Sequence, residues 1–209
     1  MRRRDLLWLF SMSWLFGLDL FSHPAPARQE GSARARAAGR QLVRIPAPTF
    51  TLTDQEGFPF ASYSWRGRVV VVTFGYTMCP DVCPLLAANL AVIQQGLPEA
   101  ERLRSGFLFI STDPEHDSPA VLREYGMRLG IDFATWKFLT GSVAELRPVW
   151  RGFGVSVQQL RPGQVDHTTL TTIVDREGIR RVNYYGTRWV PQTLMDDLVA
   201  LVRDGASGL

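Results

Sequence analysis

Two stretches of the chain are apolar at nearly every position, a pattern typical of strands buried on both faces of a sheet. The first reads VVVVTFG at residues 69–75 and the second covers Phe107–Ser111. β-branched and aromatic residues dominate both runs, which favours strands over helices. Further short apolar runs predict strands in the same way, the first two of them forming a hairpin: Phe50–Thr53, Phe58–Phe60, Trp136–Leu139, Thr169–Val174 and Arg181–Tyr185.

Helical stretches separate several of these strands. Leu85–Leu97 has a helix-compatible composition. Ser118 followed by Pro119 has the form of an N-cap with proline in the first turn, and predicts a helix that reaches about Leu129. The last predicted helix, Pro191–Val202, has an apolar side formed by Leu194, Leu198, Leu201 and Val202.

The order of these elements predicts the fold class. Strands alternate with helices, a hairpin and a helix follow, and the two cysteines come directly after the first buried strand. Such an order is typical of α/β domains with helices on both faces of a sheet. We therefore predict a thioredoxin-like central mixed β-sheet flanked by helices, with an N-terminal β-hairpin extension.

The N-terminus has the features of an export signal. Three arginines precede an apolar stretch from Leu6 to Phe21, and the small-residue segment Pro24–Ala27 follows. The apolar stretch is shorter than the roughly 20 residues that span a membrane. We predict that residues 1–27 are a signal peptide cleaved after Ala27, with an uncleaved membrane anchor as the alternative. Either places the protein in the periplasm or on the outer face of the inner membrane.

Composition indicates how the rest of the chain is organised. Residues 28–44 hold arginines among alanine, glycine and serine without apolar periodicity, and are predicted to be a flexible linker. Residues 45–209 then form one folded domain, consistent with 45% hydrophobic and 21% charged residues in the whole chain. Acidic residues are interleaved with the basic ones, so no basic stripe of the kind that binds nucleic acid is present.

Cys79 and Cys83 are the chain's two cysteines. A disulfide that closes so short a loop stabilises little, so redox chemistry or metal binding is the stronger interpretation. Redox pairs of thioredoxin type have two intervening residues, whereas here there are three. Residues four apart in a helix have Cβ atoms about 5–6 Å apart, while a disulfide needs roughly 3.5–4.5 Å. The spacing favours a shared metal without excluding a disulfide.

Three histidines are candidates for a third ligand. His23 lies in the predicted signal segment, and His116 lies in a polar loop in which Asp113 and Asp117 are interpreted as turn and capping residues. His167 comes just before a predicted strand, where a lone histidine is more often structural than metal-binding. Two thiolates and one imidazole suit copper or zinc. Closed zinc sites normally have four protein ligands, so copper is the better match.

Three segments resemble the Sco/SenC family of copper chaperones. They read FGYTMCPDVCP at 74–84, ISTDPEHDSPAVLREY at 110–125 and VDHTTLTTIVDREG at 165–178. The resemblance extends from near Thr49 to the last predicted helix. It implies a thioredoxin fold that binds a copper ion through Cys79, Cys83 and His167. Two departures concern the shape of the loop that carries His167: no tyrosine follows it in the next strand, and the segment at 157–164 is short.

The family resemblance also implies a function and its partners. Sco/SenC proteins help to assemble the dinuclear copper site of cytochrome c oxidase, so the expected partners are the oxidase's copper-binding subunit or another copper acceptor, and other copper chaperones. The expected role is binding and delivery without catalytic turnover. The alternative is a thiol–disulfide oxidoreductase in which Cys79 and Cys83 reduce the cysteines of a copper-site partner. A peroxidase of the thioredoxin superfamily is a more distant alternative.

Overall fold

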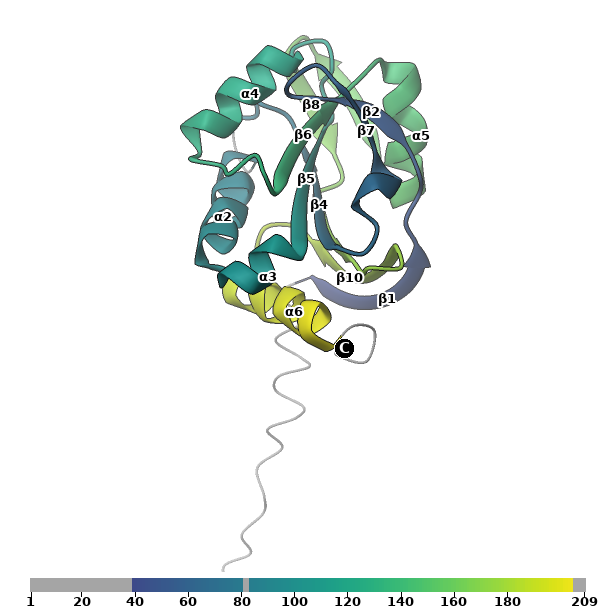
Figure 1. Ribbon diagram of the computed structural model, residues 1–209. Coiled ribbons are helices and arrows are strands. Elements are labelled where there is room, and N and C mark those ends of the chain that lie inside the picture. Colours follow the sequence, from purple (N-terminus) through teal and green to yellow (C-terminus); the bar gives the residue numbers. More distant parts are fainter. Residues whose placement is uncertain (1–38, 81–82, 205–209) are drawn as a thin grey trace, which may run out of the picture.

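The computed structural model describes residues 39–80 and 83–204. Within them, eight strands form one mixed sheet in the order β1-β10-β9-β4-β5-β6-β2-β3 (Figure 1). The strands of this sheet are β1 Arg40–Pro46, β2 Thr51–Asp54, β3 Pro59–Ala61, β4 Val69–Gly75, β5 Ser105–Ser111, β6 Trp136–Thr140, β9 Leu170–Val174 and β10 Ile179–Tyr185. A separate hairpin consists of β7 Val157–Arg161 and β8 Gln164–His167.

Helices cover both faces of the sheet. Figure 1 shows α2 and α4 on one side and α5 on the other. Within the described residues the helices are α2 Cys83–Gly96, α3 Glu99–Leu103, α4 Pro119–Arg128, α5 Val143–Phe153, α6 Pro191–Asp204 and the 3-10 turn η1 Ser62–Trp65. The predicted thioredoxin-like fold is confirmed.

The parallel strands β4, β5 and β6 form the centre of the sheet. Every residue of β4 and β5 is buried, as their continuous apolar runs predict. Gly75 and Ser111 are paired at the ends of β4 and β5. The loops that follow these two strands therefore leave the sheet side by side, and one of them carries the first cysteine.

Each face of the sheet has its own hydrophobic core. One core lies against α2, α4 and α6 and contains Trp136, which is fully buried. The Trp136 ring stacks against Phe107 and Phe138, with ring centroids 5.0 and 5.6 Å away. The other core packs α5 and the β2–β3 hairpin against the opposite face. Because a core packs against each face, the sheet supports the loops at its edge.

The N-terminal hairpin is confirmed, because β2 pairs with β3 and with β6. The prediction that residues 28–44 are all linker is wrong for its last five residues. They begin β1, which pairs antiparallel with β10. Arg40 forms two hydrogen bonds with Asp197 of α6, at 2.7 and 2.8 Å. This arginine, which was interpreted as part of a linker, therefore links the edge strand β1 to α6.

The predicted signal or anchor segment and the first part of the linker lie outside the described residues. In the described part of the chain, no helix combines the length and apolar character that crossing a membrane requires.

Candidate metal site

The cysteine loop, the start of α2 and the end of β8 meet at one edge of the molecule. Cys83 is the first residue of α2 and His167 is the last residue of β8. The Sγ atom of Cys83 lies 3.6 Å from Nε2 of His167, although the two residues are 84 positions apart in the chain. The fold therefore places an imidazole from near the end of the chain against a sulfur from a much earlier segment.

His167 is oriented by its own backbone neighbour. Its Nδ1 lies 3.1 Å from the carbonyl oxygen of Thr168. A carbonyl oxygen can only accept a hydrogen bond, so Nδ1 carries the proton and the lone pair of Nε2 is directed at Cys83. Burial lowers the pKa of His167, which keeps the ring neutral. A neutral imidazole with its second nitrogen held by a hydrogen bond is the usual form of a metal ligand.

The two thiols form a pair. A hydrogen bond with Cys79, followed by burial, raises the pKa of the Cys83 thiol. The N-terminus of α2 would favour the thiolate form of Cys83, but the hydrogen bond and burial have the larger effect on its pKa. Metal binding by both sulfurs would displace these protons, so affinity should increase with pH.

Cys79 is more accessible than Cys83. It is half-buried and borders an open pocket of about 420 Å³, whereas Cys83 is 1% exposed. The same pocket is bordered by Tyr76, Pro80, Leu160, Gln164, Val165, Asp166, His167, Thr169, Gly186 and Thr187. Among the described residues, no three His, Cys, Asp or Glu side chains are gathered closely enough to hold a metal ion. The set of Cys79, Cys83 and His167 as ligands therefore stays a prediction.

Tyr76 supports the histidine and was not identified from the sequence. Its ring meets the His167 ring edge-on, with centroids 6.1 Å apart. The backbone N–H of Val165 donates to the Tyr76 hydroxyl at 3.4 Å. Tyr76, Cys83 and Val165 form a small buried cluster that joins the cysteine loop to the β7–β8 hairpin. In the sequence, the position of Tyr76 next to the cysteine motif was the available signal.

Asp117 holds the cysteine loop in place, a larger role than the capping predicted for it. Its Oδ1 accepts hydrogen bonds from the Thr77 N–H at 3.1 Å and from the Thr77 hydroxyl at 2.6 Å. Its Oδ2 accepts from the Ser111 hydroxyl at 2.6 Å. The carboxylate is completely buried, and burial raises its pKa. It thus connects the end of β5 to the loop two residues before Cys79.

Replacing Asp117 with alanine is expected to lower the free energy of unfolding by about 3 kcal/mol, because the buried Ser111 hydroxyl and two partly buried donors of Thr77 lose their acceptor. Asp117→Asn keeps an acceptor for Thr77 and offers its amide to the Ser111 oxygen, so its loss should stay below about 1.5 kcal/mol. Urea unfolding of both variants and the parent measures this. An equal loss in the two variants would show that the charge, not the hydrogen-bond geometry, holds the loop.

His116 does not border the pocket at Cys79. It is half-buried, and its Nδ1 lies 2.8 Å from Oδ2 of Asp113. This hydrogen bond raises the pKa of His116. The ring is therefore paired within its own loop. Its exclusion as a ligand of the cysteine site stays a prediction that agrees with this placement.

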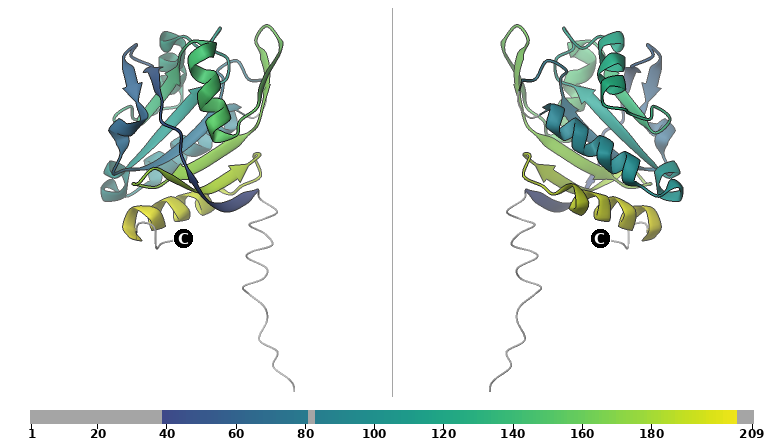
Figure 2. Two further views of the ribbon diagram at one scale, coloured as in Figure 1. Left: turned by 90° about the vertical axis from the view of Figure 1, so that its right-hand side faces the viewer. Right: turned by 90° about the vertical axis from the view of Figure 1, so that its left-hand side faces the viewer.

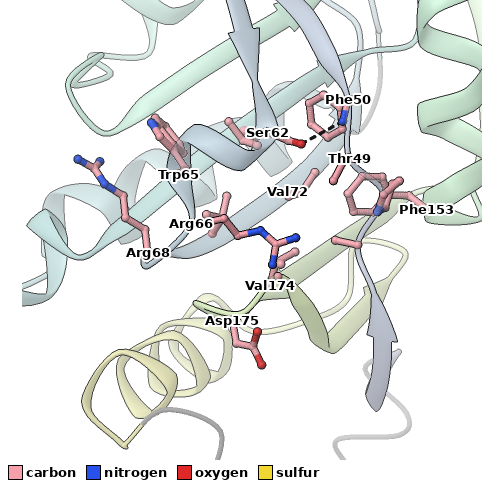
Figure 3. Close-up of a pocket in the computed structure, with 15 residues that line it drawn as sticks. Thr49, Phe50, Ser62, Trp65, Arg66, Arg68, Val72, Phe153, Val174 and Asp175 are labelled. Carbon is pink, nitrogen blue, oxygen red and sulfur yellow. Dashed lines mark hydrogen bonds between the residues drawn. The ribbon is translucent and has the colours of Figure 1, made fainter.

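A second cavity lies on the α5 face of the sheet (Figure 3). It measures about 40 Å³, enough for a few water molecules only. Val72 and Phe153 line it, and the Arg66 side chain donates a hydrogen bond to the Glu177 carbonyl beside it. No cysteine or histidine borders this cavity, so it offers no comparable chemistry.

A family model described as SCO1/SenC matches residues 40–203, beginning at the residue where β1 begins. Among curated proteins, the chain is 32% identical over 135 residues to the mitochondrial protein SCO2 of Saccharomyces cerevisiae. That match covers 62% of this chain and 44% of the yeast protein, so the chain spans less than half of that relative. It is 28% identical over 178 residues to the SCO1 protein homolog of Bacillus subtilis, covering 82% of this chain and 90% of that protein.

Solved structures of this family are also similar to the chain. A SCO1/SenC family lipoprotein from Bacillus anthracis is 29% identical, with a TM-score of 0.71 over 78% of this chain and 98% of that one. BsSco, described with a disulfide switch and as a member of the Sco family of cytochrome c oxidase assembly proteins, is 26% identical, with a TM-score of 0.67 over 78% and 96%. Copper-bound ScoI from Bradyrhizobium japonicum is 30% identical, with a TM-score of 0.62 over 74% and 98%. This chain belongs to the SCO1/SenC family.

Proposed function

We propose that the protein is a copper-binding metallochaperone for assembly of the copper site of cytochrome c oxidase. Copper would bind through the thiolates of Cys79 and Cys83 and the imidazole of His167. The observation that carries the proposal is the 3.6 Å approach of Nε2 of His167 to Sγ of Cys83, with the lone pair of the ring directed at the sulfur. The copper-bound relative supports the choice of metal.

The ligand set determines how copper would be held and released. Two soft sulfurs with one nitrogen favour Cu(I), and three ligands leave room for an incoming thiolate. Cys79 borders the open pocket while Cys83 is buried, so a thiolate of the acceptor would replace Cys79 first. A second acceptor thiolate would then replace Cys83, with His167 the last ligand to leave.

The proposed location follows from the N-terminal segment. Residues 1–27 have the charge and apolar pattern of an export signal or an anchor. The bacterial relative described as a lipoprotein supports a site of action outside the cytoplasm. We place the protein in the periplasm or on the outer face of the inner membrane, where a copper-site subunit would be reached.

A thiol–disulfide oxidoreductase is the second candidate, favoured by the hydrogen bond between the two thiols. A Cys79 thiolate would attack a partner disulfide and release one partner thiolate. Cys83 would then resolve the mixed disulfide, so that the partner gains two electrons and a Cys79–Cys83 disulfide forms. The relative with a disulfide switch supports such chemistry in the family. Copper binding and thiol attack use the same sulfurs and therefore exclude each other.

Copper transfer distinguishes the two functions. The full chain, reduced and loaded with Cu(I), is mixed with the soluble copper-binding domain of an oxidase subunit whose cysteines are reduced. We expect one copper per chain to bind and then to appear in the acceptor, with the number of free thiols unchanged. A chain that binds no copper but reduces the oxidised acceptor, at a rate that His167→Ala does not change, would establish the oxidoreductase instead.

A further inference from the structure

A groove borders the candidate metal site on the side of α5. It measures about 450 Å³ and lies between α5, the loop after β5 and strand β7. Figure 2 shows the β7–β8 hairpin standing away from the main sheet beside α5. The groove contains none of the three predicted ligands, so it is a surface separate from the metal site.

The wall formed by α5 is cationic. Val143, Arg147 and Arg151 follow one another at intervals of four residues, which places them on the same side of the helix. Arg147 and Arg151 are both exposed. Among the described residues, neither guanidinium has an ion-pair or hydrogen-bond partner. Glu115 is the acidic residue that lines the opposite wall, so the groove carries an excess of positive charge.

The wall formed by β7 offers unpaired backbone groups. In the described part of the chain β7 pairs with β8 and with no other strand, so its second edge is free. Val157 and Gln159 of this strand line the groove. A free strand edge is a template for an extended peptide, whose main chain supplies the hydrogen bonds. At the floor, the hydroxyl of Thr112 is buried and has no hydrogen-bond partner among the described residues.

Val157 connects the groove to the metal site. It lies opposite His167 in the hairpin and packs against the cluster of Tyr76, Cys83 and Val165. Adjacent strands lie about 4.8 Å apart, so a strand added to β7 would lie roughly 10 Å from the strand that carries His167. A partner bound there would have its neighbouring residues within reach of the open pocket at Cys79.

We infer that this groove docks an extended acidic segment of the protein that accepts copper, which adds to the free edge of β7 and places its carboxylates against Arg147 and Arg151. The inference rests on the proposed function for the identity of the partner. The docking chemistry itself depends only on the free edge and the two unpaired arginines.

Peptide binding tests the docking without copper. The full chain is titrated with an acetylated, amidated hexapeptide of alternating glutamate and valine or threonine, and with its lysine counterpart. The parent should bind the acidic peptide at least tenfold more tightly, and R147E/R151E should reverse that preference. Amide exchange at Val157 and Gln159 should slow in the complex. The control R123E/R128E changes exposed arginines of α4 by the same charge and should bind like the parent.

Three results would overturn the inference: equal affinity of the parent and R147E/R151E for the acidic peptide, amide protection confined to other elements, or a dimer in solution whose β7 amides are protected without peptide. The last result would assign the groove to a second copy of the chain. Copper transfer provides a separate measurement. If transfer to the oxidase domain slows about tenfold in R147E/R151E at unchanged copper affinity, both proposals stand. If the parent binds the peptide but no copper, only the proposed function fails.

Discussion

Replacing His167 with alanine is expected to weaken Cu(I) binding about 100-fold, equivalent to roughly 2.7 kcal/mol. Burial lowers the pKa of the imidazole and so favours its neutral form, its Nδ1–H is held by the Thr168 carbonyl, and Nε2 lies 3.6 Å from the Cys83 sulfur. Alanine removes a ligand that is already oriented and leaves the two sulfurs as the proposed protein ligands. Competition with a Cu(I) chelator of known affinity measures the loss.

His116→Ala is the matched control for this experiment. It removes another half-buried imidazole, which is paired with Asp113 and lies outside the cysteine pocket. Its copper affinity should equal that of the parent. Equal affinities for the parent and His167→Ala would refute the three-ligand site. Equal losses in both histidine variants would show that the effect is not specific to His167.

Trp136→Ala is expected to lower the free energy of unfolding by about 4 kcal/mol, because the ring is fully buried and its removal leaves a large cavity. The indole stacks between Phe107 and Phe138, with interplanar angles of 15° and 14°. For a domain of this size the melting temperature should fall by about 10 °C or more. Thermal and urea unfolding measure both quantities.

Trp136→Phe separates ring packing from the indole N–H. The N–H of Trp136 has no hydrogen-bond partner among the described residues. Phenylalanine keeps an aromatic ring between the two neighbours and removes this buried donor, so the loss should stay below about 1.5 kcal/mol. A loss as large as that of the alanine variant would mean that the stacked rings contribute little and that the shape of the indole is decisive.

The buried strands could be predicted because their chemistry is local. The runs that became β4 and β5 are apolar along their whole length, and a strand covered on both faces needs no other signal. The start of α4 could also be predicted, since Ser118 accepts a hydrogen bond from the Val121 N–H and a proline follows Ser118 in the chain. Each of these elements is specified by residues adjacent in the chain.

Other elements depend on contacts that a local pattern does not contain. Helix α5 was not predicted, because Pro148 lies inside it and proline is unfavourable there. The capping box between Ser142 and Glu145 and the left-handed C-cap at Gly154 define its ends despite this. Strand β1 was interpreted as linker because an edge strand with mostly exposed side chains has no apolar alternation.

The candidate site was predictable in part for the same reason. The cysteine motif is local and distinctive, and it indicated a metal or redox pair by spacing alone. His167 depends on the path of the β7–β8 hairpin, so residue spacing left it uncertain and the family resemblance was needed to select it. Tyr76 and Asp117 support the site through contacts between loops that lie far apart in the chain.

The described chain enters the sheet next to the pocket at Cys79. The Tyr185 N–H donates to the Gly39 carbonyl at 2.9 Å, and the two residues after Tyr185 border that pocket. Gly39, the first residue that the structure describes, therefore lies at the same edge of the sheet as the pocket that the proposed acceptor would approach. If the N-terminal segment is an anchor, we expect a short linker to hinder a large acceptor at this pocket and a longer linker to admit it. The length of chain between this edge and any point of attachment would then help to decide which acceptors reach the proposed copper site.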